Sequence, residues 1–145
     1  MIRIEKQLGF TLIELMVVLA IVAMISAIAM PSYKSSVRKS NRTSVQGDLQ
    51  GAAAGMALYR AQNFTYTGAA LSGTGGVFPS PSASNYDLAL TVGTTGQTFV
   101  ITATPKAGKT QVGTGALAIN QAGERCWNKS SDVACTPGTT GQEWQ

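Results

Sequence analysis

The sequence predicts an α+β protein in which one long N-terminal α-helix packs on an antiparallel sheet of three or four strands. Two observations predict this class. An apolar run near the N-terminus continues into a pattern of helical spacing, and short β-rich runs separated by turns follow it. The 145 residues suffice for one domain with an appendage. Their 44% hydrophobic and 12% charged content excludes an intrinsically disordered chain, which needs the opposite balance.

The apolar residues are concentrated in residues 10–30, which read FTLIELMVVLAIVAMISAIAM and carry a single charge at Glu14. As a helix this run spans about 30 Å, the thickness of the hydrocarbon core of a bilayer. Pro31 follows, and a kink is expected there because proline removes one backbone hydrogen bond. Beyond it, apolar residues at spacings of three and four predict that the helix continues to a total of about 50 residues. These are Val45, Leu49, Ala52, Met56 and Tyr59.

The rest of the chain has the pattern of a sheet. Residues 63–85 are rich in Gly, Ser, Thr and Ala and predict a loop. Strands are expected over residues 86–92, 98–104 and, more weakly, 115–120, with a turn over residues 93–97. Together with the amphipathic part of the helix, these strands would form an α+β head.

Three interpretations of the N-terminal segment compete. A secretory signal peptide would explain the apolar run and the small residues Ala27 and Ala29 of a cleavage site. A simple membrane anchor would explain the length of the run. Neither explains Glu14, because a charge at mid-membrane costs at least ~2.5 kcal/mol and such residues usually have a partner. The third interpretation is that a specific partner meets this carboxylate.

The N-terminal residues MIRIEKQLGFTLIELMVVLAIVAMISAIAMPSY resemble the class III signal and first helix of the type IVa pilins and their pseudopilin relatives. In that family a prepilin peptidase cuts after the glycine, here Gly9, and N-methylates the new N-terminal residue, here Phe10. The glutamate near the mature N-terminus of the family is matched by Glu14, and its helix-kinking proline by Pro31. The resemblance is specific over residues 1–33 and general across the head.

This resemblance implies the pilin fold and a division of the chain. Residues 1–9 would be the leader peptide, which is removed, and residues 10–30 the transmembrane and fibre-core helix. Residues 31–145 would be the globular head. The head would comprise the C-terminal half of the helix (31–62), the loop between helix and sheet (63–85), and the sheet with a disulfide region (86–145).

The resemblance also implies a role for Glu14 in assembly. Cleavage would expose an α-amine on Phe10, a cation at neutral pH, in the same apolar layer as Glu14. Within one helix the two groups could be near each other, and a neighbouring subunit offset along the helix axis could pair them across chains. Either group left alone in that layer would be costly, so pairing can set the axial register of assembly.

Cys126 and Cys135 are nine positions apart near the C-terminus. Two unrelated buried thiols are the simplest interpretation, but exported domains favour a disulfide, and pilins carry a C-terminal disulfide-bounded region. Residues 59–66 and 102–106 resemble the PilE-like pilins, which are often minor components. Residues 111–115 depart from that sub-family, since they read QVGTG where it usually has Asp-x-x-Cys-Gly.

The composition argues against an enzyme. The chain has no histidine, the commonest general base and metal ligand, and its two cysteines cannot make a four-cysteine zinc site. It has no phosphate-binding loop, and the carboxylates of residues 10–145 are scattered along the sequence. We therefore expect no catalytic residue, no metal and no cofactor.

The chain without its leader would carry nine basic and six acidic side chains, a net charge of +3. One basic cluster follows the apolar run. It could contact anionic lipid headgroups before assembly, or neighbouring subunits and solvent in a fibre. Contact with DNA phosphates during uptake is the alternative, but helix residues beside the membrane span would be buried in a fibre. Basic residues of the head are better candidates, and Trp127 beside one of them could stack. The cluster is Lys34, Arg38, Lys39 and Arg42, and the head candidates are Lys106, Lys109, Arg125 and Lys129.

These observations favour a structural subunit of a type IV pilus, or fimbrium, acting in adhesion, twitching motility or DNA uptake. The expected partners are the chain itself and other pilins in a helical fibre, the prepilin peptidase, an inner-membrane assembly platform, and the membrane before assembly. DNA is a further candidate partner. The expected location is the inner membrane of a Gram-negative bacterium and then an extracellular fibre. Two alternatives stay open: a minor pilin that primes the fibre or receives DNA, and a type II secretion pseudopilin.

The first prediction concerns processing. We expect the mature chain to begin at Phe10 and to carry one N-methyl group, because the prepilin peptidase of the resembled family both cuts and methylates. Mass spectrometry of the mature N-terminal peptide measures this directly. A chain that begins at Met30 would instead mean cleavage by ordinary signal peptidase after Ala29.

Overall fold

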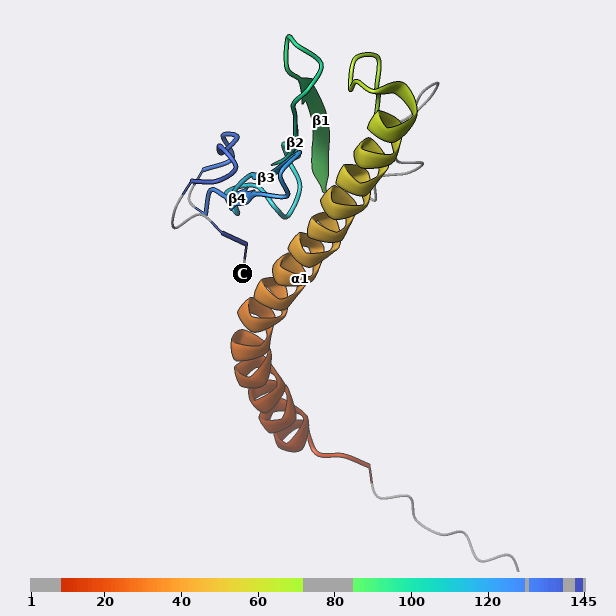
Figure 1. Ribbon diagram of the computed structural model, residues 1–145. Coiled ribbons are helices and arrows are strands. Elements are labelled where there is room, and N and C mark those ends of the chain that lie inside the picture. The colour runs from red at the N-terminus through yellow and green to blue at the C-terminus, as the bar shows by residue number, and fades with distance from the viewer. Residues whose placement is uncertain (1–8, 72–84, 130, 140–142, 145) are drawn as a thin grey trace, which may run out of the picture. The chain divides into compact units, whose positions relative to one another are not determined.

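The computed structural model describes residues 9–71, 85–129, 131–139 and 143–144. Within these ranges it has one helix, α1 (Leu12–Asn63), and four strands, β1 (Tyr86–Val92), β2 (Phe99–Pro105), β3 (Leu117–Asn120) and β4 (Arg125–Trp127) (Figure 1). The predicted α+β class is confirmed. The three expected strands are present, β1 with the expected bounds and β2 and β3 with ends shifted by one or two residues, and β4 completes the sheet. Of the expected loop over residues 63–85, residues 72–84 lie outside the described residues.

Helix α1 is 52 residues long, close to the predicted length, and it includes Pro31. By its internal contacts the chain divides into two compact units, Met1–Val37 and Arg38–Gln145, and α1 contributes to both. In the first unit, residues 10–30 are exposed along their whole length. In the described residues, the part of α1 near the N-terminus is long and apolar enough to cross a membrane. This apolar surface therefore has no cover within its own unit.

In the second unit the four strands form one antiparallel sheet in the order β1-β2-β3-β4. The registers place Tyr86 opposite Pro105 and Leu117 opposite Trp127. Alternate residues of β2 point to the core, as its burial pattern shows, while the residues between them are only partly covered. The described part of the sheet is therefore apolar on one face, which must be covered by another element.

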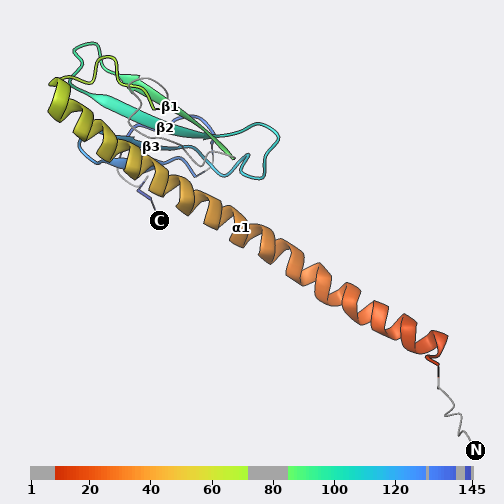
Figure 2. The ribbon, with the colours of Figure 1, turned by 90° about the vertical axis from the view of Figure 1, so that its right-hand side faces the viewer.

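The C-terminal half of α1 covers that face (Figure 2). The predicted helical stripe is confirmed, since its first four members are buried and Tyr59 is half-buried. The buried stripe and the sheet form one apolar cluster. It comprises Val45, Leu49, Ala52 and Met56 of α1, with Tyr66, Tyr86, Phe99, Ile101, Ala103, Leu117 and Ile119.

The sheet has two ends that differ in what they contact. We call the end where β1 and β3 begin and β2 and β4 finish the proximal end. There the β2–β3 loop meets the first residue of the second unit, because Arg38 Nε donates a hydrogen bond to the Thr110 carbonyl at 2.9 Å. At the opposite, distal end, Arg60 near the end of α1 donates to Gln97 Oε1 at 2.8 Å. Two polar contacts thus fix the direction of α1 along the sheet.

A buried glutamine reinforces the proximal contact. Gln111 in the β2–β3 loop is fully buried, and its Nε2 donates to the Arg38 carbonyl of α1 at 3.3 Å. Its Oε1 accepts a hydrogen bond from the Tyr86 hydroxyl at 3.1 Å and lies 3.0 Å from the Thr114 hydroxyl. Burial raises the pKa of the Tyr86 hydroxyl, which keeps it in the neutral form that donates. The side chain of Gln111 therefore joins helix, sheet and loop.

We expect Gln111→Leu to destabilise the head by about 1–3 kcal/mol, because a leucine leaves the buried Tyr86 hydroxyl without its glutamine acceptor. Denaturant unfolding of the full chain in detergent would measure this, with the fluorescence of its two tryptophans as the signal. The matched control is Gln50→Leu on the exposed side of α1, which should change stability by no more than about 0.5 kcal/mol. Equal stability of the two variants would contradict the assigned role of Gln111.

Candidate functional site

The carboxylate predicted to act in assembly lies in the first turn of α1. Glu14 Oε2 accepts hydrogen bonds from the Thr11 backbone N–H at 2.9 Å and from the Thr11 hydroxyl at 2.8 Å. In return the Glu14 backbone N–H donates to Thr11 Oγ1 at 3.3 Å. This reciprocal pattern is a capping box, in which the first and fourth residues satisfy each other's free donors at a helix start. It explains why α1 begins directly after Thr11.

Thr11 was not singled out by the sequence analysis, although the signal was present. Thr-Leu-Ile-Glu has the spacing of a capping box just before an apolar run. The predicted cleavage site lies immediately before it. Gly9 and Phe10 are both exposed and precede α1, so the peptide bond between them is outside the helix. The first turn thus combines an accessible junction with a carboxylate that is surrounded by exposed apolar side chains such as Ile13 and Leu15.

The structure divides the predicted basic cluster on α1. Arg38 is held by the β2–β3 loop through the Thr110 carbonyl. The Arg42 guanidinium lies 3.9 Å from the centroid of the Trp127 ring, a cation–π stack that packs the helix against β4. Lys34 and Lys39 are exposed. Two of the four cations therefore contribute to the packing of the head, a role that their spacing in sequence did not reveal.

The four head residues predicted as DNA contacts divide by the end of the sheet. Lys106 and Lys109 follow β2 and Lys129 follows β4, so all three lie at the proximal end. Lys106 forms an ion pair with Asp87 at 3.6 Å, and Lys129 Nζ lies 5.1 Å from the Trp127 ring centroid. Arg125 begins β4 on the distal side, where its guanidinium lies 5.2 Å from the Trp144 ring centroid. The structure brings three of the four candidates to one end.

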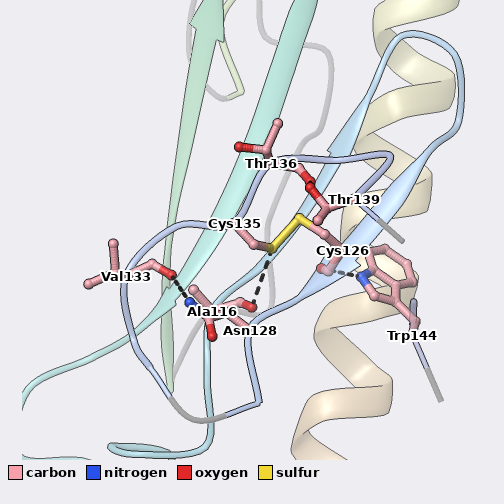
Figure 3. The surroundings of a disulfide bond; sticks show 8 residues. All are labelled: Ala116, Cys126, Asn128, Val133, Cys135, Thr136, Thr139 and Trp144. Carbon is pink, nitrogen blue, oxygen red and sulfur yellow. Dashed lines mark hydrogen bonds between the residues drawn. A yellow bond between two sulfur atoms is a disulfide. The ribbon is translucent and has the colours of Figure 1, made fainter. Parts of the chain in front are cut away.

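Cys126 and Cys135 form a disulfide, as the resemblance implied (Figure 3). Both sulfur-bearing residues are buried with Ala118 and Val100 on the face of the sheet that points away from α1. The Trp144 indole N–H donates to the Cys126 carbonyl at 2.7 Å (Figure 3). Inside the disulfide loop, Asn128 Nδ2 donates to the Val133 carbonyl.

The disulfide loop also holds the β2–β3 loop in place. The two carboxylate oxygens of Asp132 accept hydrogen bonds from the backbone N–H groups of Gly113 and Gly115 at 2.8 and 3.0 Å. Gly115 has φ of +96°, and a side chain there would collide with the Asn128 carbonyl. Glycine is therefore required where the two loops approach each other. Their described parts form one connected surface at the proximal end.

Within the described residues, no group of three or more Cys, Asp or Glu side chains is close enough to hold a metal ion. Several of the described carboxylates are used in protein contacts. Glu14 caps α1, Asp132 binds backbone N–H groups, and Glu124 accepts a hydrogen bond from Asn120 Nδ2 at 2.6 Å.

Comparison with known proteins connects this arrangement to a family. Residues 5–30 match the model of the prokaryotic N-terminal methylation motif. Residues 31–118, more than half of the chain, match the family described as "Type IV minor pilin ComP, DNA uptake sequence receptor". This chain belongs to that family of type IV pilins. The predicted resemblance to pilins is confirmed, and the family consists of structural proteins rather than enzymes.

Individual relatives agree with this family. The "Type IV wide pilus major component PilA4" of Thermus thermophilus is 34% identical over 69% of this chain and 83% of its own length. The "Type IV major alpha-pilin" of Moraxella bovis is 51% identical over 31% of this chain. The "Type II secretion system core protein G" of Pseudomonas aeruginosa is 38% identical over 43% of this chain. These last two matches cover only 28% and 44% of the length of the relatives.

Proposed function

We propose that the mature type IV pilin begins at Phe10 and is a structural subunit of a pilus. Residues 10–30 hold it in the inner membrane before assembly and then pack against the same segment of other pilins. The observation that carries this proposal is the exposed apolar segment of α1 with one carboxylate in its first turn. The family supports it, because its members are pilins.

The apolar surface requires a cover that the described residues of its own unit do not provide. Fourteen large apolar side chains of residues 10–30 are exposed, and burying such a side chain stabilises by about 1.5–3 kcal/mol. Lipid tails can cover them, and so can the helices of other subunits. A segment of this kind can therefore leave the bilayer for a fibre with little loss of apolar burial, which suits a subunit that must do both.

Glu14 would then determine how two subunits align. Both hydrogen bonds that Glu14 accepts from Thr11 use Oε2, so the other carboxylate oxygen, Oε1, remains available on an exposed side chain of α1. After cleavage the α-amine of Phe10 is a cation in the same layer. Pairing this amine with Glu14 of a neighbouring subunit removes two uncompensated charges from an apolar layer. The pairing thus favours one axial offset between subunits.

The proposal includes the remaining partners and the location. A prepilin peptidase would cut after Gly9, and an inner-membrane platform would move subunits into the fibre. The completed fibre would be extracellular, in a Gram-negative bacterium, with Pro31 at the end of the fibre-core segment. The head would display the disulfide loop and would act in adhesion, twitching motility or DNA uptake without catalysis.

We expect Glu14→Ala to reduce incorporation into fibres strongly, because it removes the charge that pairs with the Phe10 amine. Immunoblots of sheared surface fibres, normalised to the cellular amount of the pilin, would measure the yield. The control is Glu14→Gln, which retains capping-box hydrogen bonding but has no charge. A normal fibre yield from Glu14→Gln together with a low yield from Glu14→Ala would mean that Glu14 acts as a helix cap and not through its charge. A normal yield from Glu14→Ala contradicts any role of Glu14 in assembly.

A DNA-uptake role is the second candidate. The matched family is described as a DNA uptake sequence receptor, and the proximal end carries Lys106, Lys109 and Lys129, with Trp127 beside Lys129. Lysines bind phosphates and an aromatic ring can stack on a base. Arg125, on the distal side with Trp144, is less well placed to act with them.

If this end binds duplex DNA, neutralising two phosphate contacts should weaken binding and lower the slope of log affinity against log salt by about 2. The variant is Lys109→Gln with Lys129→Gln, and the matched control is Arg125→Gln on the distal side. Fluorescence anisotropy with labelled duplex at several salt concentrations measures both quantities for the detergent-solubilised mature chain. Unchanged affinity in the double variant contradicts DNA contact at the proximal end.

A type II secretion pseudopilin is the third candidate, supported by the match to the secretion protein of Pseudomonas aeruginosa. The disulfide of this chain argues against the major pseudopilin, which generally lacks a C-terminal cysteine pair. The composition of sheared fibres separates these roles. A dominant band marks a major pilin, and a trace band with loss of transformation on deletion marks a priming or receptor subunit.

A further inference from the structure

The charges of the second unit are separated along its length. Of its eight basic side chains, six lie at the proximal end, together with two acidic ones. One of these acids, Asp87, is paired with Lys106, and the other, Asp132, binds backbone N–H groups. The remainder of the unit has more acidic than basic side chains. The proximal cations are Arg38, Lys39, Arg42, Lys106, Lys109 and Lys129.

Exposed apolar side chains accompany these cations. Val112 in the β2–β3 loop is 47% exposed and Val133 in the disulfide loop is 70% exposed. Each follows an exposed lysine of the same loop, Lys109 or Lys129, by three or four positions. We call these four residues the proximal surface. Apolar side chains interleaved with cations are typical of surfaces that contact the boundary between lipid headgroups and acyl chains.

The two loops present this surface in a fixed form. Asp132 connects them through its bonds to Gly113 and Gly115, and the Ala116 N–H donates to the Ser131 carbonyl at 3.2 Å. Gln111 and Thr110 join the β2–β3 loop to Arg38 of α1. Because these bonds already hold the described residues of both loops, contact with a partner costs little further conformational entropy there.

The chain connects this surface closely to the apolar segment. Arg38 is the eighth residue after Met30, and eight helical residues extend about 12 Å. The headgroup layer outside the hydrocarbon core is roughly 6 Å thick on each side, and charges act over about 8–10 Å at physiological salt. This short connection therefore keeps Arg38, the first residue of the second unit, within electrostatic reach of the headgroups while residues 10–30 span the bilayer.

We propose that, before assembly, the proximal surface docks the pilin head onto an anionic membrane surface, with Lys109 and Lys129 at phosphate groups and Val112 and Val133 in the headgroup layer. The proposal goes beyond the fibre role and uses only the part of the proposed function that places residues 10–30 in a bilayer. Charge complementarity favours anionic over neutral lipid. The exposed valines favour lipid over DNA, since a phosphate backbone provides no apolar contact for them.

Electron paramagnetic resonance can test this with the full mature chain in nanodiscs. A nitroxide is attached to Ala107→Cys in the β2–β3 loop, and in a second sample to Ala61→Cys near the distal end of α1; both alanines are exposed. Collisional relaxation by nickel chelated to lipid headgroups reports contact with the membrane surface. We expect strong relaxation at position 107 in discs containing phosphatidylglycerol, and background values at position 61 and in phosphatidylcholine discs.

Charge variants decide whether the lysines cause the contact. Each neutralised lysine should lower the docking equilibrium about fivefold, so Lys109→Gln with Lys129→Gln should reduce relaxation at position 107 nearly to background. Arg60→Gln, at the distal end, should leave it unchanged. Relaxation that does not depend on anionic lipid, or that persists in the double variant, overturns the proposal. If the double variant loses its affinity for duplex DNA but keeps its relaxation, the surface is a nucleic-acid contact and the membrane proposal is wrong. The yield of sheared fibres tests the proposed function separately: a normal yield from the double variant supports the role as a pilus subunit, whether or not the membrane proposal holds.

Discussion

The structure depends on one constraint: a single helix has to meet two different surroundings. From Arg38 onward, one face of α1 packs on the sheet through Val45, Leu49, Ala52 and Met56. Over residues 10–30 the helix is exposed along its whole length and carries a single charged side chain, Glu14. A helix that is hydrophobic all round must be buried in something. Among the described residues its own unit does not supply that burial, and this is the observation behind the proposed cover by lipid or by other subunits.

The free energies of burial show that the apolar residues and Glu14 have different roles. Covering fourteen large apolar side chains is worth on the order of 20 kcal/mol or more. A carboxylate costs roughly 2.5–3.5 kcal/mol at the centre of a bilayer on insertion scales, which is an upper figure for Glu14 in the first turn of α1. The apolar residues therefore decide whether the segment is covered, and Glu14 cannot prevent it. A cost of that size is nevertheless enough to select among alignments of otherwise similar apolar surfaces, because 1.4 kcal/mol changes an equilibrium tenfold.

Local patterns predicted most of the fold. The apolar run, the helical stripe and the strand at residues 86–92 depend on neighbours in sequence, and all three are present. β4 was not located, because three residues beside a cysteine have too little pattern to distinguish a strand from a loop. The contacts of Gln111, Arg38 and Arg42 could not be predicted. They join positions more than seventy residues apart, and only the folded chain brings them together.

The basic cluster on α1 shows that residues of like charge close together in sequence can have different structural roles. Four cations close in sequence suggest one electrostatic surface, but Arg38 and Arg42 are used for packing and leave Lys34 and Lys39 exposed. Two lysines from distant loops, Lys109 and Lys129, restore the positive charge at the same end of the sheet. Arginine suits the first task because its planar guanidinium can stack on Trp127 and donate to a carbonyl. Lysine suits the second, since its long apolar stem can lie along a surface while the ammonium stays in water. The arginine and lysine positions are therefore not equivalent, and the exposed lysines of this end come from two loops as well as from the helix.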